Sequence, residues 1–174
     1  MEKLLFSGKP KRYTTMSDFS PEIRNFLDTF EYRDGELYRK HGQFAGKAGT
    51  IHHTGYVQVK IGKKCYRVHR VIFAMHHGYL PEMIDHIDRN ILNNRIENLR
   101  PANNQQNQFN AKIPCRNKSG IKNVYWEKRS SKWCVVMRVH GKISRLFRTH
   151  DVDLAELVAI EARNKYHGEF VNHG

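Results

Sequence analysis

Residues 85–90, with the sequence DHIDRN, carry the side chains best suited to chemistry. A histidine directly follows a carboxylate there, and the carboxamides of Asn98, Asn107 and Asn110 follow downstream. A neutral imidazole can take a proton from water near neutral pH, and a divalent cation accepts carboxylate and carboxamide oxygens. These residue types in one basic chain predict hydrolysis of phosphodiester bonds.

Each of these side chains has a role that its chemistry suggests. His86 is the candidate general base, and Asp85 and Asn107 are the candidate ligands of one Mg²⁺ or Mn²⁺ ion, with no zinc expected. Asn98 is expected to tie the loop together through backbone hydrogen bonds and so to hold His86. Asn110 either reaches the metal shell or faces solvent, and solvent is favoured.

Other interpretations of the same residues are weaker but open. An Asp-His pair by itself is most often a surface ion pair, and only the downstream asparagines raise it to a catalytic candidate. His69 stands near the expected start of a helix, and a structural histidine is favoured there over a metal ligand.

The charge of the chain points to a polyanionic partner. Its 174 residues include 30 Lys and Arg against 17 Asp and Glu, a formal charge of +13. Such an excess favours a polyanion, with nucleic acid as the first candidate. The partner expected from the chain as a whole is double-stranded DNA. Residues 112–148 supply +10 of it, because they hold one acid, Glu127, against eleven bases: Lys112, Arg116, Lys118, Lys122, Lys128, Arg129, Lys132, Arg138, Lys142, Arg145 and Arg148.

The cysteines and the apolar runs exclude several classes of protein. Three widely separated cysteines, Cys65, Cys115 and Cys134, argue against a disulfide framework and fit a reducing cytoplasm. No apolar run is long enough for a signal peptide or a membrane span. We expect a cytoplasmic protein that is monomeric, with no membrane or protein partner.

The first part of the chain predicts a small mixed fold. Ser20 followed by Pro21 predicts a helix from 21 to about 29. Turn residues and strand formers then predict two hairpins, at 31–39 and 55–68, before a helix at 69–77.

The catalytic candidates fall on a strand, loop, strand and helix. The expected elements are a strand at 83–87, a loop at 88–98 too polar to be buried, a strand at 99–102 and a helix at 103–111. This order places His86 at a strand end and Asn107 on the facing helix, so we expect the two side chains to converge.

These elements resemble the HNH endonucleases of phage homing elements. The residues that carry the resemblance are Val68-His69-Arg70-Val71-Ile72, Ile84 to Asn90, Asn93-Asn94-Arg95, Asn98-Leu99-Arg100 and Gln106-Asn107. The resemblance covers about 30–111 and implies a ββα-metal nuclease that hydrolyses DNA with one divalent cation. Asn107 stands where the motif has its second histidine, as in some phage members.

The C-terminal part predicts a second small domain. Alternating patterns predict strands at 121–127, 133–140 and 143–148, and Asp153 is the expected N-cap of a helix that packs on them. The fold class is therefore α+β: a ββα-metal core with N-terminal hairpins, followed by a three-stranded antiparallel sheet on one helix.

Residues 117–171 resemble the ethylene-response-factor, or APETALA, type of DNA-binding domain. The resemblance rests on Ser119 to Trp126, Lys132-Trp133, Gly141-Lys142 and Lys165 to Phe170. It implies that the outer face of the sheet contacts DNA. The candidate contacts are Lys122, Tyr125, Trp126, Lys128, Arg129, Lys132, Arg138 and Arg145. For Trp133 a place in the core is at least as well supported, and the same holds for Trp126.

The whole chain predicts a DNA endonuclease with its own DNA-binding module. The expected domains are a basic arm and helix at 1–29, the nuclease at 30–111, a basic linker at 112–118 and the DNA-binding domain at 119–174. The resemblance implies homing between bacteriophage genomes, with nicking or double-strand cutting both open. The alternatives are a DNA-binding regulator with a decayed nuclease site and an RNA-binding or nucleoid-type protein.

Overall fold

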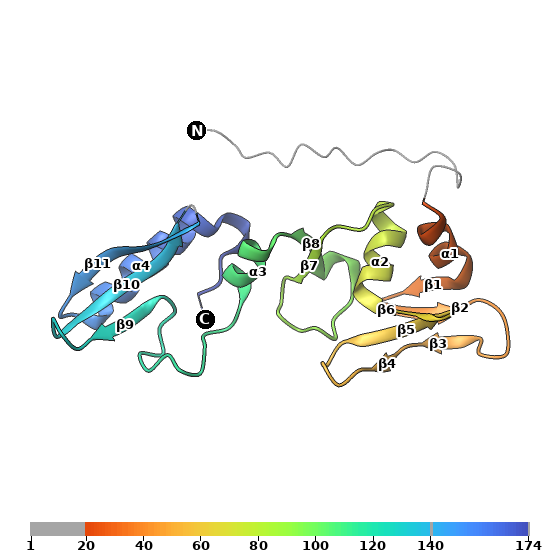
Figure 1. Ribbon diagram of the computed structural model, residues 1–174, viewed down its shortest axis with the longest axis horizontal. Coiled ribbons are helices and arrows are strands. Elements are labelled where there is room, and N and C mark those ends of the chain that lie inside the picture. Colours follow the sequence, from red (N-terminus) through yellow and green to blue (C-terminus); the bar gives the residue numbers. More distant parts are fainter. Residues whose placement is uncertain (1–19, 140, 174) are drawn as a thin grey trace. The chain divides into compact units, whose positions relative to one another are not determined.

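The computed structural model describes residues 20–139 and 141–173, and the basic arm expected before Ser20 lies outside them. The chain forms two compact units, unit 1 (Met1–Asn103) and unit 2 (Asn104–Gly174). Helices and small antiparallel sheets occur in both, which confirms the α+β class (Figure 1). No helix in the described ranges has the length and apolar character needed to cross a bilayer.

Unit 1 carries three small sheets and two helices. Its elements are α1 (Pro21–Thr29), β1 (Phe30–Arg33), β2 (Glu36–Arg39), β3 (Gly46–Ala48), β4 (Thr50–Ile51), β5 (Val57–Ile61), β6 (Lys64–Arg67), α2 (Val68–His77), β7 (Met83–His86), η2 (Ile96–Asn98) and β8 (Leu99–Ala102). The sheets have the orders β1-β2-β3, β4-β5-β6 and β7-β8, all antiparallel. Both predicted hairpins are confirmed, whereas the short strands β3 and β4 were not predicted.

Local sequence signals explain where the helices begin and end. The Ser20 side chain accepts a hydrogen bond from the Ile23 amide, and Pro21 occupies the first helical position of α1. At the C-terminal end of α2, Gly78 caps the helix in a left-handed conformation that glycine adopts without a steric penalty. The predicted boundaries of α1 and α2 are therefore confirmed to within a residue.

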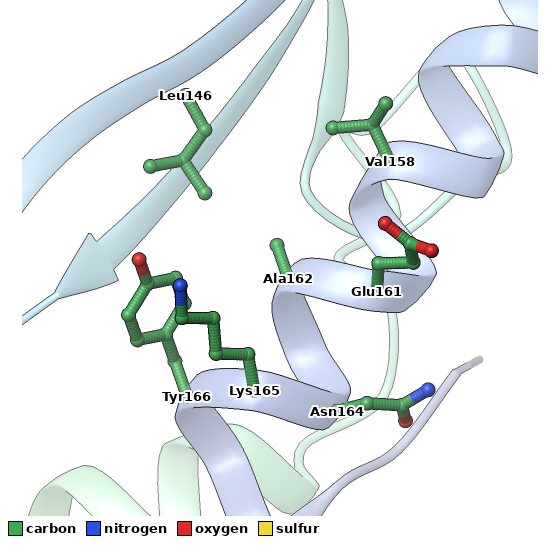
Figure 2. Close-up of a pocket in the computed structure, with 7 residues that line it drawn as sticks. All are labelled: Leu146, Val158, Glu161, Ala162, Asn164, Lys165 and Tyr166. Atoms are coloured by element: carbon green, nitrogen blue, oxygen red, sulfur yellow. The ribbon is translucent and has the colours of Figure 1, made fainter.

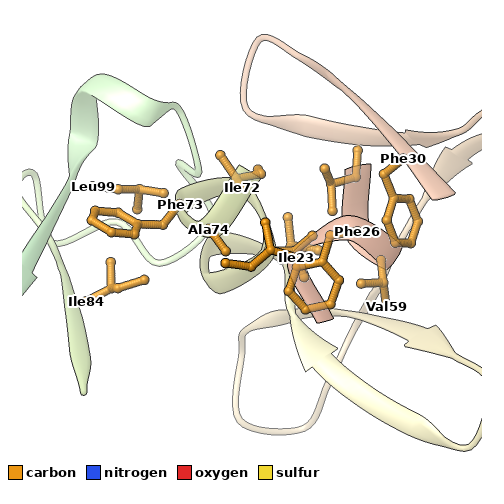
Figure 3. Packing of buried hydrophobic residues seen from close by; sticks show 12 residues of the cluster. Ile23, Phe26, Phe30, Val59, Ile72, Phe73, Ala74, Ile84 and Leu99 are labelled. Atoms are coloured by element: carbon orange, nitrogen blue, oxygen red, sulfur yellow. The ribbon is translucent and has the colours of Figure 1, made fainter. Parts of the chain in front are cut away.

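A single apolar core joins these elements. It has α2 at its centre, with Phe73 pointing toward Ile84 of β7 and Leu99 of β8 (Figure 3). Toward the N-terminal sheets, the core continues through Phe26 and Val59. The strand pair that carries Asp85 and His86 is therefore fixed to α2 by hydrophobic burial.

Unit 2 is a three-stranded sheet with one long helix against it. Its elements are α3 (Asn104–Asn110), β9 (Val124–Glu127), β10 (Lys132–Val139), β11 (Lys142–Thr149), α4 (Val152–His167) and η3 (Gly168–Phe170), and the sheet order is β11-β10-β9. Val124 and Val135 pack against Ala155 and Ala159 of α4. The predicted three strands and helix are confirmed.

Two details of unit 2 differ from the sequence prediction. The N-cap of α4 is Asp151, whose carboxylate accepts from the amides of Asp153 and Leu154, so the assignment to Asp153 was wrong by two residues. The compact units also divide before α3, at Asn103 and Asn104, whereas the predicted nuclease domain ends after it. The assignment of α3 to that domain by function stays a prediction.

The turn between β1 and β2 approaches the polar loop that follows β7. Gly35 has a φ of +89°, and a Cβ there would lie 3.0 Å from the Arg95 amide nitrogen. The neighbouring Asp34 carboxylate accepts from the Arg95 guanidinium at 2.7 Å. The absence of a side chain at position 35 thus allows the hairpin to brace the loop.

Replacing Gly35 with alanine is expected to destabilise unit 1 by about 1–3 kcal/mol, because the new methyl group meets backbone at a positive φ. The matched control is Gly62→Ala, where φ is also positive, at +58°, but nothing lies within 4 Å of the added Cβ. Urea unfolding of both variants measures the difference. Equal losses of stability would show that the close approach to Arg95 has no energetic consequence.

Candidate functional site

The carboxylate of Asp85 is buried and paired across the strands. In the β7-β8 register Asp85 lies opposite Arg100, and His86 opposite Leu99. The Arg100 guanidinium donates from Nε and Nη2 to Asp85 Oδ2 at 2.8 and 2.7 Å. Asp85 is 4% exposed, so the guanidinium supplies the charge that a buried carboxylate needs. The surface ion pair considered from the sequence is therefore wrong, because Asp85 pairs with Arg100 in the interior.

His86 is held by groups from three parts of unit 1. Its side chain is 5% exposed, and its Nε2 lies 3.2 Å from Asn94 Oδ1. The ring of His69, from the start of α2, meets it edge-on with centroids 5.0 Å apart. Tyr56, which precedes β5, completes the surroundings at 5.3 Å from the His69 ring and 6.3 Å from the His86 ring.

The loop after β7 is closed by side chains in place of regular structure. Asn98 Oδ1 accepts from the Asp88 amide, and its Nδ2 donates to Asp88 Oδ1 and to the Asn93 carbonyl, all at 2.8 to 2.9 Å. The Asn98 carbonyl accepts from the Ile87 amide. Such bonds let asparagine and aspartate stabilise a turn in the way that backbone partners do.

The Asp88 carboxylate is the centre of this loop network. Burial opposes its ionisation, but hydrogen bonds from Asn93, the Asn90 amide and Asn98 outweigh burial and lower the pKa of Asp88 below its usual value. Asp88 therefore stays ionised at neutral pH and fixes the loop.

One prediction about this loop, that its polar residues are exposed, was wrong. The loop was expected to be too polar for burial, yet Asn94 and Asn98 are both buried. Their amide groups find partners inside the loop, which removes the cost of burial. The sequence prediction gave Asn94 no role at the site, because its contact with His86 depends on the path of the loop and no spacing rule indicates it.

His69 is a buried neutral histidine. Burial is the main cause that lowers its pKa from 6.5 to about 3, and the positive potential of His86, Arg67 and Arg70 adds to it. Its contacts in the described structure are ring contacts with Tyr56 and His86. The structural role favoured from the sequence fits this environment.

The third candidate ligand belongs to unit 2. Asn107 is an exposed residue of α3, whereas Asp85 and His86 lie in unit 1. The convergence of Asn107 with His86 therefore stays a prediction. Asn110, at the end of the same helix, is buried, so its expected exposure to solvent was wrong.

The residues around Asp85 and His86 match a known family. Residues 66–109 match the model described as HNH endonuclease. Over 111 residues the chain is 37% identical to Protein 3.8 of Escherichia phage T7. This match covers 62% of the chain and 89% of Protein 3.8. Over 143 residues it is 38% identical to an uncharacterized HNH endonuclease of Acanthamoeba polyphaga mimivirus, with 68% and 71% covered. No solved structure gives a significant match.

The chain belongs to the HNH endonuclease family. The matched residues run from β6 through α3 and so include the proposed base, Asn98 and both proposed ligands. Membership confirms the prediction of a nuclease that acts on DNA.

Lys122 is not available for the DNA contact expected of it. It is 7% exposed, and its Nζ donates to the carbonyls of Phe109 and Ala111 at 2.7 and 2.5 Å. The charge of this lysine is therefore used at the end of α3, where helical carbonyls lack partners within the helix. The prediction of a phosphate contact by Lys122 was wrong.

The aromatic candidates of β9 lie on opposite faces of the sheet of this HNH protein. Trp126 pairs in register with Trp133, and their rings meet at 5.0 Å on the side that α4 covers, which leaves Trp126 44% exposed. Tyr125 is exposed on the other side, opposite Cys134. Trp133 packs against the core of unit 2, whereas Trp126 stays exposed, so a contact of Trp126 with DNA stays a prediction. Of the two aromatic residues of β9, Tyr125 is the one on the outer face.

The outer face of this sheet is basic. Alternation and register place Tyr125, Lys132, Arg138, Arg145 and Arg148 on it, together with Glu127. Glu127 accepts from Arg145 at 2.7 Å and lies 3.7 Å from Arg148, so one acid partly neutralises two bases. Lys128 and Arg129 are exposed in the turn after β9. The contact of the candidates Tyr125, Lys128, Arg129, Lys132, Arg138 and Arg145 with DNA stays a prediction.

A hollow of about 700 Å³ lies between β11 and α4, apart from the predicted chemistry. Leu146, Val158, Ala162 and Tyr166 line it, with Glu161, Asn164 and Lys165 on the helix beside them (Figure 2). No candidate catalytic, metal or DNA-binding residue is among the lining groups. The assignment of the chemistry to Asp85 and His86 stays a prediction.

Replacing Asn98 with alanine is expected to destabilise unit 1 by about 2–3 kcal/mol, because the amide and the carboxylate of Asp88 both lose partners. The matched control is Asn90→Ala in the same loop, since Asn90 is exposed and its side chain accepts one bond, from Leu92. Urea unfolding measures both. Equal stabilities of the two variants would contradict a special role of Asn98 in closing the loop.

The stability of unit 1 is expected to fall as the pH drops from about 6.5 toward about 3, because His69 gains a proton in that range only when the chain unfolds. The measurement is the urea midpoint against pH for the parent protein and for His69→Gln. The variant should show a shallower dependence in this window. Parallel curves would mean that His69 does not resist protonation.

Proposed function

We propose that this HNH endonuclease is a homing-type enzyme that hydrolyses DNA with one divalent cation and with His86 as general base. The observation that carries the proposal is the buried Asp85–His86 pair, with its own partner on each side chain. Arg100 holds the carboxylate and Asn94 holds the imidazole. A positioned carboxylate that can bind a cation, next to a positioned base, suits phosphodiester hydrolysis in a basic chain.

The contact with Asn94 supports Nδ1 as the nitrogen of His86 that would take the proton. Asn94 Nδ2 donates to the Leu92 carbonyl at 3.4 Å, which assigns Oδ1 to the side that faces His86. A carboxamide oxygen only accepts, so in this arrangement Nε2 of His86 is the nitrogen that donates to Asn94, and Nδ1 is the acceptor nitrogen of the neutral ring. His86 would thus take the proton of the attacking water at Nδ1.

The donor set fits a hard divalent cation. In the described residues no three His, Cys, Asp or Glu side chains are grouped as metal ligands. A site with one carboxylate, Asp85, and one carboxamide, Asn107, completed by water and phosphate oxygens, suits Mg²⁺ or Mn²⁺ better than zinc. When bound, the cation would stabilise the negative charge that develops on the phosphate and the leaving oxygen.

Unit 2 is the proposed DNA-binding module. Its resemblance to the APETALA type and the basic outer face of β9-β11 support this assignment, with Tyr125, Lys128, Arg129, Lys132, Arg138 and Arg145 as the proposed contacts. Two modules on one chain raise each other's effective concentration at a shared duplex. Unit 2 would thereby hold the DNA that unit 1 cuts, and one chain would suffice.

The decisive test is His86→Ala with supercoiled plasmid and phage DNA in the presence of Mg²⁺ or Mn²⁺. The parent protein should nick or linearise the DNA, chelation of the cation should stop it, and the variant should lose at least about 100-fold in rate because the base is gone. The exposed His41→Ala is the matched control and should cut normally.

DNA binding by the His86→Ala variant, followed by gel shift, should remain. A parent protein that shifts DNA but cuts neither substrate with either cation would favour the regulator over the enzyme. Primer extension across the products then tells nicking from double-strand cutting, because it maps the break on each strand.

A further inference from the structure

The hairpin β5-β6 in unit 1 has an outer face that lies outside the proposed catalytic site. Val59 and Tyr66 point inward, and the Tyr66 ring packs edge-on against Phe26 of α1. Strand alternation places the residues between them on the opposite side, where Gln58 pairs in register with Arg67 and Lys60 with Cys65. We call Gln58, Lys60, Cys65 and Arg67 the hairpin face; the last three are exposed.

The hairpin face lies in a second basic part of the chain. Residues 37–81 contain no Asp or Glu, but they contain eight bases: Arg39, Lys40, Lys47, Lys60, Lys63, Lys64, Arg67 and Arg70. The charge of unit 1 is therefore as one-sided here as that of residues 112–148 in unit 2.

The two N-terminal sheets of unit 1 differ in whether their basic side chains form ion pairs with carboxylates. On the β1-β2-β3 sheet, Arg33 pairs with Glu31 and Lys47 with Glu36. Over the described part of the chain, no carboxylate lies within 4.0 Å of the basic groups of the β5-β6 hairpin, which are Lys60, Lys63, Lys64 and Arg67. Glu22 lines a hollow together with Lys63 and Lys64, whereas Lys60 and Arg67 of the hairpin face have no carboxylate partner among the described residues.

A continuous series of contacts leads from the hairpin face to His86. The Arg67 guanidinium stands 4.5 Å above the centre of the Tyr56 ring. The Tyr56 ring in turn lies 6.3 Å from the ring of His86. A DNA strand carries one phosphate for about every 3.4 Å of helix axis, so the path from His86 through Tyr56 to Arg67 spans only a few phosphates of one strand.

We propose that the hairpin face is a DNA-binding surface of unit 1, which binds the phosphates of the cleaved strand beside the scissile one, with Arg67 nearest to His86. The assignment rests on the proposed function, because a cleaved strand presupposes cleavage. It gives unit 1 a hold on DNA that is independent of unit 2. The stacking of Arg67 on Tyr56 fixes the direction of the guanidinium before DNA arrives.

The first test measures binding without cleavage. Two full-length proteins are titrated with a short duplex of random sequence over a range of salt concentrations. One carries His86→Ala alone, and the other carries Lys60→Gln and Arg67→Gln in addition. Each lost phosphate contact should reduce the slope of log affinity against log salt by about 0.9, so the pair should reduce it by about 2. Lys47→Gln, which removes a lysine already paired with Glu36, should leave the slope unchanged.

The second test uses the exposed thiol in the middle of the surface. In full-length Cys115→Ser protein the accessible thiol of the described structure is Cys65, because Cys134 is buried. Duplex DNA should slow the alkylation of Cys65 by a maleimide. The control is a chain without Cys65 and Cys115 that carries Asp28→Cys. Asp28 is exposed on α1, which packs against the inner side of the hairpin. DNA should therefore not slow the alkylation of this thiol.

Unchanged salt slopes, or equal alkylation of Cys65 with and without duplex, would overturn the assignment. So would stronger protection by an RNA duplex than by DNA. The outcome is separable from the proposed function. A protein that cuts DNA but shows neither effect contradicts the surface, whereas one that shows both effects but never cuts contradicts the nuclease mechanism.

Discussion

The register between β7 and β8 is the constraint on which the site depends. Ile84 and Leu99 bury their side chains against Phe73 of α2, and this hydrophobic contact selects one pairing of the strands. With that pairing, Asp85 falls opposite Arg100 and His86 points to the same side as Ile84, toward His69. A slip of one residue would exchange the two faces of the strand and bury Asp85 among apolar groups. Chemistry at this site is thus positioned by burial that takes no part in it.

The asparagine-rich loop solves a second problem, which is how to bury polar backbone without regular structure. Asn98 and Asp88 supply partners to the chain from 87 to 98, while Asn94 supplies one to His86. The loop is also held from outside, by Asp34 on Arg95 and by the Tyr32 hydroxyl, which accepts from the Ile96 amide. These asparagines therefore have structural roles that a motif read only for catalysis does not reveal.

Features that depend on neighbouring residues in the sequence could be predicted. Pro21 after Ser20, the Asp34-Gly35 turn and Gly78 each determine local backbone conformation, so α1, the first hairpin and the end of α2 follow from the sequence. For α4 the same reasoning met two aspartates two residues apart, and local sequence alone did not decide which one caps the helix.

Features that depend on tertiary packing could not be predicted. Lys122 has the charge and the strand-rich surroundings of a phosphate contact, but its side chain is long enough to reach carbonyls at the end of α3. The contact of Asn94 with His86 depends in the same way on the course of a loop of irregular backbone. The same length and flexibility that suit lysine to phosphates also suit it to buried carbonyls, and composition does not separate the two uses.

The helix α3, which carries the proposed metal ligand Asn107, is held in place by residues of unit 2. Its C-terminal carbonyls accept from Lys122 and from Asn172, which donates to Asn110 and Ala111, while His167 stacks on Phe109 with centroids 3.8 Å apart. The fully buried Arg163 donates to the Lys122 carbonyl and so extends this network to α4. A helix of seven residues is too short to be stable alone, so it folds because unit 2 satisfies its end. The family match nevertheless runs from β6 through α3, across the boundary between the units. The third motif residue, Asn107, therefore depends on unit 2 for its helix, and unit 2 supports the proposed metal ligand as well as the proposed contacts to DNA.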